Sequence, residues 1–179
     1  MVAVPTKKLF VLIGLPFSGK TTWAREFVGD SVAIISRDVI LENMQKDVSM
    51  RTRLLIEAQN ILVPESHMFD SREKNAWNDV GTREYIRHVS EKICASGEDV
   101  VIVDGTHLSK ASRKFVAMDF GRKKVALLIG TSKDVCIDRW RYARTSGIRS
   151  SITEDLIQKM DALREEPSLD EGFDEILRK

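Results

Sequence analysis

A short apolar segment followed by a glycine-rich loop constrains this chain more than any other feature of its sequence. Residues 8–13 (KLFVLI) are continuously hydrophobic, which is typical of a strand covered on both faces. Residues 14–21 (GLPFSGKT) match the spacing GxxxxGK[ST], and residues 21–28 have helical character. A strand, this loop and a helix in that order predict a phosphate-binding loop, or P-loop.

The chemistry of the loop indicates which residues hold the phosphates. Glycines let the backbone fold round an anion, so that successive N–H groups and the start of the next helix point at it. We expect Lys20 to reach the β- and γ-phosphates of ATP and the Thr21 hydroxyl to bind Mg²⁺. The residues expected to bind the nucleotide are Gly14, Pro16, Ser18, Gly19, Lys20, Thr21 and Thr22. An ordinary strand-to-helix turn is the less favoured alternative.

Strand and helix patterns alternate along the rest of the chain. This alternation predicts one α/β domain over residues 1–179, with a central parallel sheet of about five strands flanked by helices. In such sheets the ligand crevice lies at the carboxyl ends of the strands. Further strands are expected at 32–35, 100–103, 124–129 and, at the edge, 173–177, and helices at 51–63, 82–94, 109–120, 133–144 and 153–163.

The composition fits a globular chain. Of 179 residues, 42% are hydrophobic and 31% charged, and no apolar run approaches the ~20 residues of a membrane helix. Cys94 and Cys136 lie far apart without metal-binding spacing, which favours two half-buried thiols in a reducing, cytoplasmic compartment. Residues 107–149 carry eleven Lys or Arg against three Asp, whereas residues 150–179 carry four against nine acidic residues. A basic central part suits phosphate-rich ligands, although a solvated surface explains the same counts.

Four segments together resemble the kinase domain of the 5′-OH polynucleotide kinases of phages and of eukaryotic end-healing enzymes. Residues 14–27 (GLPFSGKTTWAREF) resemble that family's GxPxSGKST loop and helix, and residues 36–38 (SRD) its Asn-Arg-Asp tripeptide. Residues 101–107 (VIVDGTH) resemble its IxDxTN segment, and residues 167–176 (PSLDEGFDEI) the P-x-L-x-EGF-x-x-I ending of eukaryotic members. The resemblance is weakest between residues 43 and 98.

This resemblance implies Mg²⁺-dependent transfer of the γ-phosphate of ATP to the 5′-OH end of DNA or RNA. Asp38 matches the family's general base, and a carboxylate at the crevice suits that role because it can accept the hydroxyl proton. The alternative for Asp38 is an N-cap of the segment that follows. Arg37, Asp104 and Thr106 match residues on the acceptor side. Asp104 also suits Mg²⁺, a cap for the next helix, or the orientation of an arginine.

The resemblance further implies a lid at about residues 139–150 and a helical insert at about 43–97 that builds the acceptor pocket. Lid arginines clamp the transferring phosphoryl group, and Arg139 and Arg144 are the candidates. The helix carrying them is expected to be capped by Ser132, and the next helix by Ser151 or Thr153. His107 replaces the family's asparagine and is expected to have a positional role.

One position departs from the family. Three residues after Asp38, where the phage kinases have an arginine that grips the acceptor's 3′-phosphate, this chain has Leu41. Either Arg37 or Lys46 substitutes for it, or the acceptor is bound differently. In residues 43–97, Phe69, Trp77 and Tyr85 are candidates for base stacking, although burial in the core is the more common fate of such residues.

Two other functions fit the same motifs. The first is a P-loop kinase of a small hydroxyl compound, such as a nucleoside, a sugar or an antibiotic. The second is a nucleotide-dependent ATPase or switch module that transfers nothing. The Arg37–Asp38 pair and the lid arginines argue against the switch, because a switch needs no base for an acceptor hydroxyl.

Overall fold

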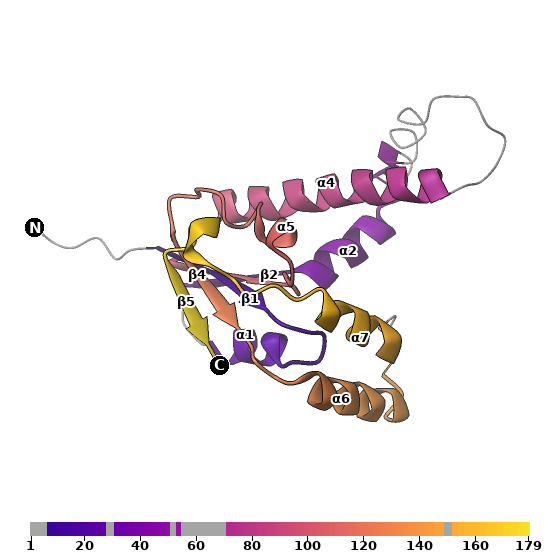
Figure 1. Cartoon of the computed structure of the whole chain (residues 1–179). Helices are drawn as coiled ribbons and strands as arrows, with labels where there is room; N and C mark the ends of the chain where they lie inside the picture. Colours follow the sequence, from indigo (N-terminus) through magenta and orange to yellow (C-terminus); the bar gives the residue numbers. More distant parts are fainter. Residues whose placement is uncertain (1–6, 28–30, 51–52, 55–70, 149–151) are drawn as a thin grey trace, which may run out of the picture. The chain divides into compact units, whose positions relative to one another are not determined.

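The computed structural model describes residues 7–27, 31–50, 53–54, 71–148 and 152–179, without the side chains of 71–80 (Figure 1). The chain forms two compact units. The first contains residues 1–36 and 96–179, and the second contains residues 37–95. Each unit is described by itself.

The first unit is built on a parallel sheet of five strands in the order β2-β3-β1-β4-β5. The sheet confirms the predicted α/β fold class, including the position of the last strand at an edge. Its register places Ser36, at the end of one edge strand, opposite Asp104. The strands are β1 (Lys8–Ile13), β2 (Val32–Ser36), β3 (Val100–Asp104), β4 (Lys123–Leu128) and β5 (Glu175–Arg178).

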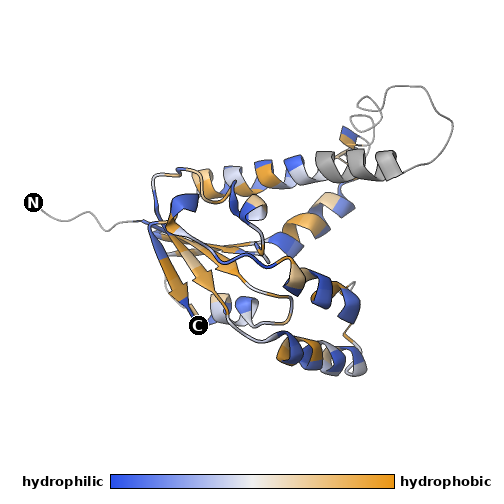
Figure 2. Cartoon of the chain, in the orientation of Figure 1, coloured by the Kyte–Doolittle hydropathy of each residue, from blue (hydrophilic) through white to orange (hydrophobic). Residues whose placement is uncertain are grey.

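The central strands are buried on both faces, as their continuous hydrophobic runs predicted. Successive strand residues point to opposite faces, and on β1 and β3 the residues of both faces are buried, including Leu9, Phe10, Val11, Val101 and Ile102. Hydrophobic residues accordingly dominate the strands (Figure 2). The cluster on the side of the first helix consists of Phe10, Leu12, Ala24, Ile102, Val125, Leu127 and Ile129.

The helices of this unit follow their strands closely. The expected caps are present at two of them, because Ser132 accepts a hydrogen bond from Val135 N–H and Thr153 accepts one from Leu156 N–H. The other cap candidate, Ser151, lies outside the described residues. The helices are α1 (Lys20–Glu26), α5 (Lys110–Arg113), α6 (Lys133–Thr145), α7 (Glu154–Ala162) and the 3-10 helix η1 (Leu169–Glu171).

Helix α5 is much shorter than the predicted helix at 109–120. Turns replace the helix from Lys114 onward. The segment then bends at Gly121, which adopts the left-handed conformation (φ 64°), and the Asp119 side chain accepts a hydrogen bond from the Gly121 N–H. A side chain that satisfies a nearby backbone donor competes with helix formation, so the Asp119–Gly121 bond disfavours the predicted extension of the helix to residue 120.

The second unit contains α2 (Arg37–Lys46) and α4 (Ser71–Ala95). Helix α4 begins 11 residues before the predicted start at residue 82 and continues through Gly81, at a propensity cost of about 1 kcal/mol. Residues 53–54 are helical, but the rest of the helix predicted at 51–63 lies outside the described residues. Phe69 and the side chain of Trp77 lie outside them as well.

The two cysteines differ in environment. Cys136 is buried and Cys94 is exposed, and both thiols are free. The prediction of half-buried thiols is therefore wrong for Cys94. Burial raises the pKa of the Cys136 thiol, which disfavours the reactive thiolate. No helix in the part of the chain that the structure describes is long and apolar enough to span a bilayer.

Candidate active site

The P-loop connects β1 to α1 and contains two residues in the left-handed backbone conformation. Phe17 and Gly19 both have positive φ values, 64° and 102°. Left-handed residues in a tight loop bring successive N–H groups to one concave side, which is the arrangement that binds anions. Gly14 is required for a different reason, since a Cβ there would lie 2.9 Å from Ser18 Oγ and 3.1 Å from the Ile129 carbonyl oxygen.

Lys20, the first residue of α1, is held inside the loop. Its Nζ donates to the Leu15 carbonyl at 2.6 Å and to Ser18 Oγ at 3.3 Å. The side chain is only 7% exposed, so its positive charge is concentrated at the concave side of the loop. A cation at this place attracts the phosphates of a nucleotide and supplies a hydrogen-bond donor to them.

Asp104 and Thr21 meet beside the loop, although 83 residues separate them in the chain. The Thr21 hydroxyl donates to Asp104 Oδ2 at 2.6 Å. Asp104 ends β3, next to β1 in the sheet, and is 7% exposed. Two hard oxygen donors at a phosphate loop fit Mg²⁺, which takes few protein ligands and completes its octahedron with phosphate oxygens and water. The described residues hold no group of three or more His, Cys, Asp or Glu that could bind a metal alone.

The alternative role of Asp104 as a helix cap does not hold. Ser109 caps α5, accepting a hydrogen bond from Ser112 N–H at 3.2 Å. Thr106, the other candidate of this segment, contributes through its backbone, since its carbonyl accepts a hydrogen bond from Gly14 N–H at 3.0 Å.

The two candidate lid arginines occupy different surroundings on α6. Arg139 Nη1 donates to the carbonyls of Phe17 and Ser18, at 3.1 and 3.2 Å, so its guanidinium lies against the P-loop. Arg144 instead has its guanidinium 5.6 Å from the centroid of the Trp140 ring. Arg149, a further arginine of the expected lid, lies outside the described residues. Of the two described arginines, the structure therefore brings Arg139 to the loop.

Helix α6 is anchored so that Arg139 keeps this place. Trp140 is buried and its indole N–H donates to the Ile152 carbonyl at 2.8 Å, at the approach to α7. The cluster beneath α6 joins it to the loop and contains Leu15, Leu108, Cys136, Ile137, Trp140 and Ile157.

Thr131 is a loop contact that the sequence interpretation missed. Its hydroxyl donates to the Ser18 carbonyl at 2.8 Å, beside the bond from Arg139 to the same oxygen. The available signal was its position, since Thr131 follows the end of β4 at the edge of the sheet where ligands bind. Neither Pro16 nor Thr22 makes a side-chain hydrogen bond among the described residues.

Arg37 and Asp38 belong to the second unit. Helix α2 begins at Arg37, so Asp38 lies in its first turn. The alternative prediction that Asp38 is the N-cap of this helix is therefore wrong. A carboxylate in the first turn still interacts favourably with the helix dipole. Asp38 is exposed, and Arg37 has its guanidinium 5.7 Å from the centroid of the buried Tyr85 ring.

The second unit also contains Leu41, which stands where the phage kinases have an arginine, and the residues proposed to replace that arginine. Leu41 is partly buried on α2. Lys46, one of the two proposed substitutes, pairs with Glu42 at 2.6 Å in an exposed i, i+4 arrangement. Tyr85 is 8% exposed, which favours a core role over base stacking.

A scan against protein families matches residues 9–167 to the family described as AAA domain (AAA_33). The chain belongs to this AAA domain family. The match covers the P-loop, Asp38, Asp104 and the arginines of α6. A search of the curated proteins finds no match.

Solved structures similar to this AAA domain include a gluconokinase, a candidate kinase and an RNA repair complex. A candidate kinase from Chloroflexus aurantiacus superposes with a TM-score of 0.59 at 15% identity, over 99% of this chain and 86% of the other. A gluconokinase from Sinorhizobium meliloti gives 0.55 at 18% identity, over 98% and 83%. The Pnkp1/Rnl/Hen1 RNA repair complex gives 0.53 at 17% identity, over 90% of this chain and 45% of the other.

These likenesses establish a P-loop kinase-like fold for this AAA domain. The fold supports a phosphotransferase and implies binding of ATP and usually Mg²⁺. The loop, Lys20 and the Thr21–Asp104 pair fit such a ligand. The similar structures include both a gluconokinase and an RNA repair complex, so the fold by itself is compatible with more than one acceptor.

Proposed function

We propose that this AAA domain transfers the γ-phosphoryl group of ATP to the 5′-hydroxyl end of DNA or RNA. The observation that carries the phosphotransfer is the Thr21–Asp104 hydrogen bond beside the P-loop, which joins a hydroxyl and a carboxylate where the nucleotide's phosphates and Mg²⁺ would be held. The acceptor is supported by the four segments that resemble polynucleotide kinases, and by the structural likeness to an RNA repair complex.

In this proposal the acceptor hydroxyl attacks the γ-phosphorus. A bond forms between the 5′-oxygen and phosphorus, and the bond from phosphorus to the oxygen bridging to the β-phosphate breaks, which releases ADP. Asp38 accepts the hydroxyl proton, because the attacking oxygen loses it as the new bond forms. Ser36, two residues before Asp38, is in register with Asp104 at the carboxyl ends of the strands.

The residues of the P-loop balance the charge that moves during transfer. Backbone N–H groups of the loop and of the first turn of α1, together with Lys20, hold the phosphates. Mg²⁺, held by Thr21 with Asp104 beside it, supplies Lewis-acid neutralisation of the phosphate oxygens when bound. Within the described part of the chain, Arg139 makes two hydrogen bonds, both through Nη1, so other N–H groups of its guanidinium can contact the transferring phosphoryl group.

A small-molecule kinase is the second candidate. It is favoured by the likeness to a gluconokinase, which covers 98% of this chain and 83% of that one. The two candidates share every residue of the P-loop and differ in the acceptor pocket, which we expect at about residues 43–97.

Transfer of label from γ-labelled ATP separates these candidates. The panel contains single- and double-stranded DNA and RNA oligonucleotides with 5′-OH ends, each matched by the same oligonucleotide with a 5′-phosphate, and a set of hydroxyl metabolites that includes gluconate. Label on 5′-OH ends alone is the expected result. Efficient labelling of a metabolite with inert 5′-OH ends would replace the proposal with the second candidate, and phosphate release without any labelled product would favour the ATPase or switch.

A further inference from the structure

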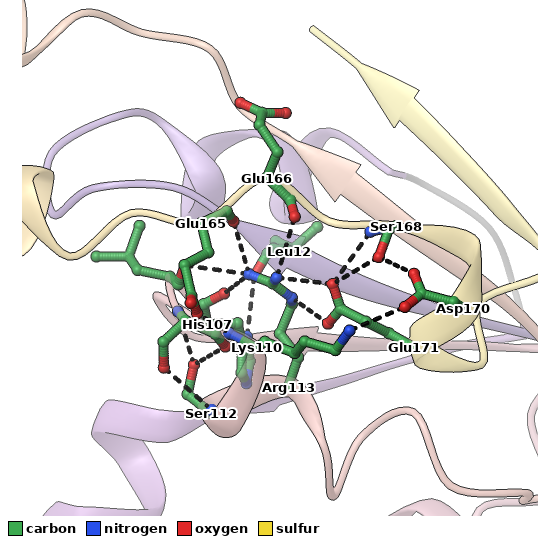
Figure 3. A network of polar contacts seen from close by, with 12 residues as sticks. Leu12, His107, Lys110, Ser112, Arg113, Glu165, Glu166, Ser168, Asp170 and Glu171 are labelled. Atoms are coloured by element: carbon green, nitrogen blue, oxygen red, sulfur yellow. Dashed lines mark hydrogen bonds and ion pairs between the residues drawn. The ribbon is translucent and has the colours of Figure 1, made fainter.

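Arg113, the last residue of α5, is the most unusual buried side chain in the described part of the first unit. It is completely buried, although it lies outside the four segments that resemble polynucleotide kinases. Its guanidinium is surrounded by oxygen atoms from three segments (Figure 3). A buried charge of this kind needs full compensation, and a side chain retained at this cost suggests a role in positioning.

One side of the guanidinium binds the C-terminal part of the unit. Nε and Nη2 donate to the two carboxylate oxygens of Glu171 at 2.7 and 2.8 Å, a bidentate pair. The carbonyls of Glu165 and Glu166 accept further hydrogen bonds at 3.0 and 3.4 Å. Glu171 is fixed in turn by Ser168 N–H, which donates to its Oε1 at 3.0 Å.

The other side binds the segment that follows β3. Nη1 donates to the carbonyls of His107 and Leu108 at 3.0 and 3.1 Å. The backbone here is unusual, because His107 has a positive φ of 43°. A residue that is not glycine needs support from its surroundings to keep such a conformation.

The same segment is attached to the start of the P-loop. His107 Nδ1 lies 2.9 Å from the Leu12 carbonyl of β1, and Gly14 N–H donates to the Thr106 carbonyl at 3.0 Å. Gly105 leaves room for the imidazole, since a Cβ there would lie 2.7 Å from His107 Cε1. Asp104, which accepts the hydrogen bond from Thr21, immediately precedes this segment.

We propose that Arg113, held by Glu171, is a positioning residue for Mg²⁺-nucleotide binding. It fixes the segment that follows Asp104 through the carbonyls of His107 and Leu108, and thereby keeps Asp104 in hydrogen-bonding position beside Thr21. Residues that orient the groups around a metal affect its affinity without touching it. The inference rests on the nucleotide-binding part of the proposed function and is independent of the acceptor.

The test measures affinity for a fluorescent ADP analogue, once with Mg²⁺ and once with EDTA, together with the Mg²⁺ concentration that half-saturates the complex. In Arg113→Lys the charge stays, but the planar fork that serves several acceptors is lost. We expect Mg²⁺ affinity to fall by about 10–100-fold, as for other residues that orient metal ligands, while affinity in EDTA changes little. Glu171→Asp keeps the carboxylate, shortens its reach and should give a smaller loss of the same kind.

Lys110→Met is the matched control. Lys110 Nζ pairs with Asp170 Oδ2 at 2.9 Å, and so joins the same two segments at an exposed position without touching the carbonyls at 107 and 108. This variant should keep wild-type Mg²⁺ affinity. Thermal unfolding of every variant sets a temperature at which all are folded, and Glu171→Asp carries the test if Arg113→Lys does not fold.

Three results would overturn the inference. Unchanged Mg²⁺ affinity in the folded variants would do so, and so would equal losses of affinity with Mg²⁺ and with EDTA that follow the loss of thermal stability. In either case the Arg113–Glu171 pair would only hold the segments together, and the proposed function would stand. A wild-type protein that binds no nucleotide would overturn both proposals at once.

Discussion

The polar side chains of the P-loop and those of the second unit are organised in opposite ways. Beside the loop, partners come from distant parts of the chain: Thr21 bonds Asp104, and Arg139 bonds the carbonyl of Phe17. On α2 and α4, several charged residues pair within one helix, as Lys46 does with Glu42. Local i, i+4 pairs contribute only about 0.2–0.5 kcal/mol each and place no group precisely.

This difference suggests that the P-loop is preformed for its ligand, whereas the charged side chains of α2 can rearrange when an acceptor binds. The loop is held by contacts across the sheet, so its donors are in place before any phosphate arrives, which lowers the cost of binding and of catalysis. An exposed ion pair on α2, such as Lys46–Glu42, can break at little cost in free energy. We therefore expect substitutions beside the loop to act on the nucleotide, and those on α2 to act on transfer or on local stability.

Lys20→Ala should have the largest effect. It removes the cation that is held inside the loop, and transfer of label from γ-labelled ATP should fall by at least about 10³-fold. Lys159→Ala, which removes an exposed lysine paired with Asp155 on α7, is the control and should transfer normally. Near-wild-type transfer by Lys20→Ala would contradict the assignment of residues 14–21 as a phosphate-binding loop.

The same contrast explains what the sequence could predict. The P-loop, the five strands and the α6 cap at Ser132 follow from patterns within a few residues, such as GxxxxGK[ST] and a serine before a helix. The structure confirms these elements to within two residues. The fold class follows from them because a parallel sheet needs the alternation of strands and helices.

Other features depend on contacts between distant segments and left no local pattern. Arg113 is one basic residue among several in residues 107–149, and nothing in the sequence distinguishes it from the exposed Lys110 and Lys114. The exposure of Cys94 has the same origin. Nor does spacing alone separate Arg139 from Arg144, because only the packing of α6 decides which of them meets the P-loop.

Asp38→Asn tests the other side of the comparison. The amide cannot accept the hydroxyl proton, so kcat for transfer to 5′-OH oligonucleotides should fall by about 10²–10³-fold. ATP affinity should stay within about twofold, because only a transition-state interaction is removed. Glu42→Gln, which changes an exposed carboxylate on the same helix, should leave kcat unchanged. A parallel loss of ATP binding and thermal stability would instead assign Asp38 to the helix dipole.

Arg139→Ala and Arg144→Ala are a matched pair on one helix. Arg139 lies against the P-loop, so its loss should lower kcat by roughly 10–100-fold. Arg144 stacks on Trp140, and its loss should lower kcat about twofold through the loss of a cation–π contact of about 1 kcal/mol. Titration of the labelled product against ATP concentration gives kcat and KM for each variant. The reverse ranking would make Arg144 the lid arginine.

The smallest effect is expected at Glu84, where α4 departs from the purely local pattern. This carboxylate is 10% exposed and receives hydrogen bonds from Arg87 and, at 2.6 Å, from Arg53. The hydrogen bond from Arg87 is the main cause that lowers the pKa of Glu84, with the charges of Arg53 and Arg87 adding to it. Glu84→Gln should therefore cost about 1–2 kcal/mol of stability near neutral pH.

The pH dependence of stability shows whether Glu84→Gln destabilises α4 by removing the charge of Glu84 or by altering its packing. A carboxylate whose pKa is lower in the folded than in the unfolded state, where it is about 4.3, contributes its stability above that pH. The contribution disappears as the pH falls through the lowered folded pKa, because the wild-type residue becomes protonated as well.

Hydrogen exchange of peptides from residues 81–95 should thus show a gap in protection between wild type and Glu84→Gln at pH 7 that closes in acid. Glu91→Gln, which breaks the exposed pair with Arg87 on the same helix, should show a smaller gap. A gap at Glu84 that persists in acid would mean that the shape of the side chain, rather than its charge, supports α4.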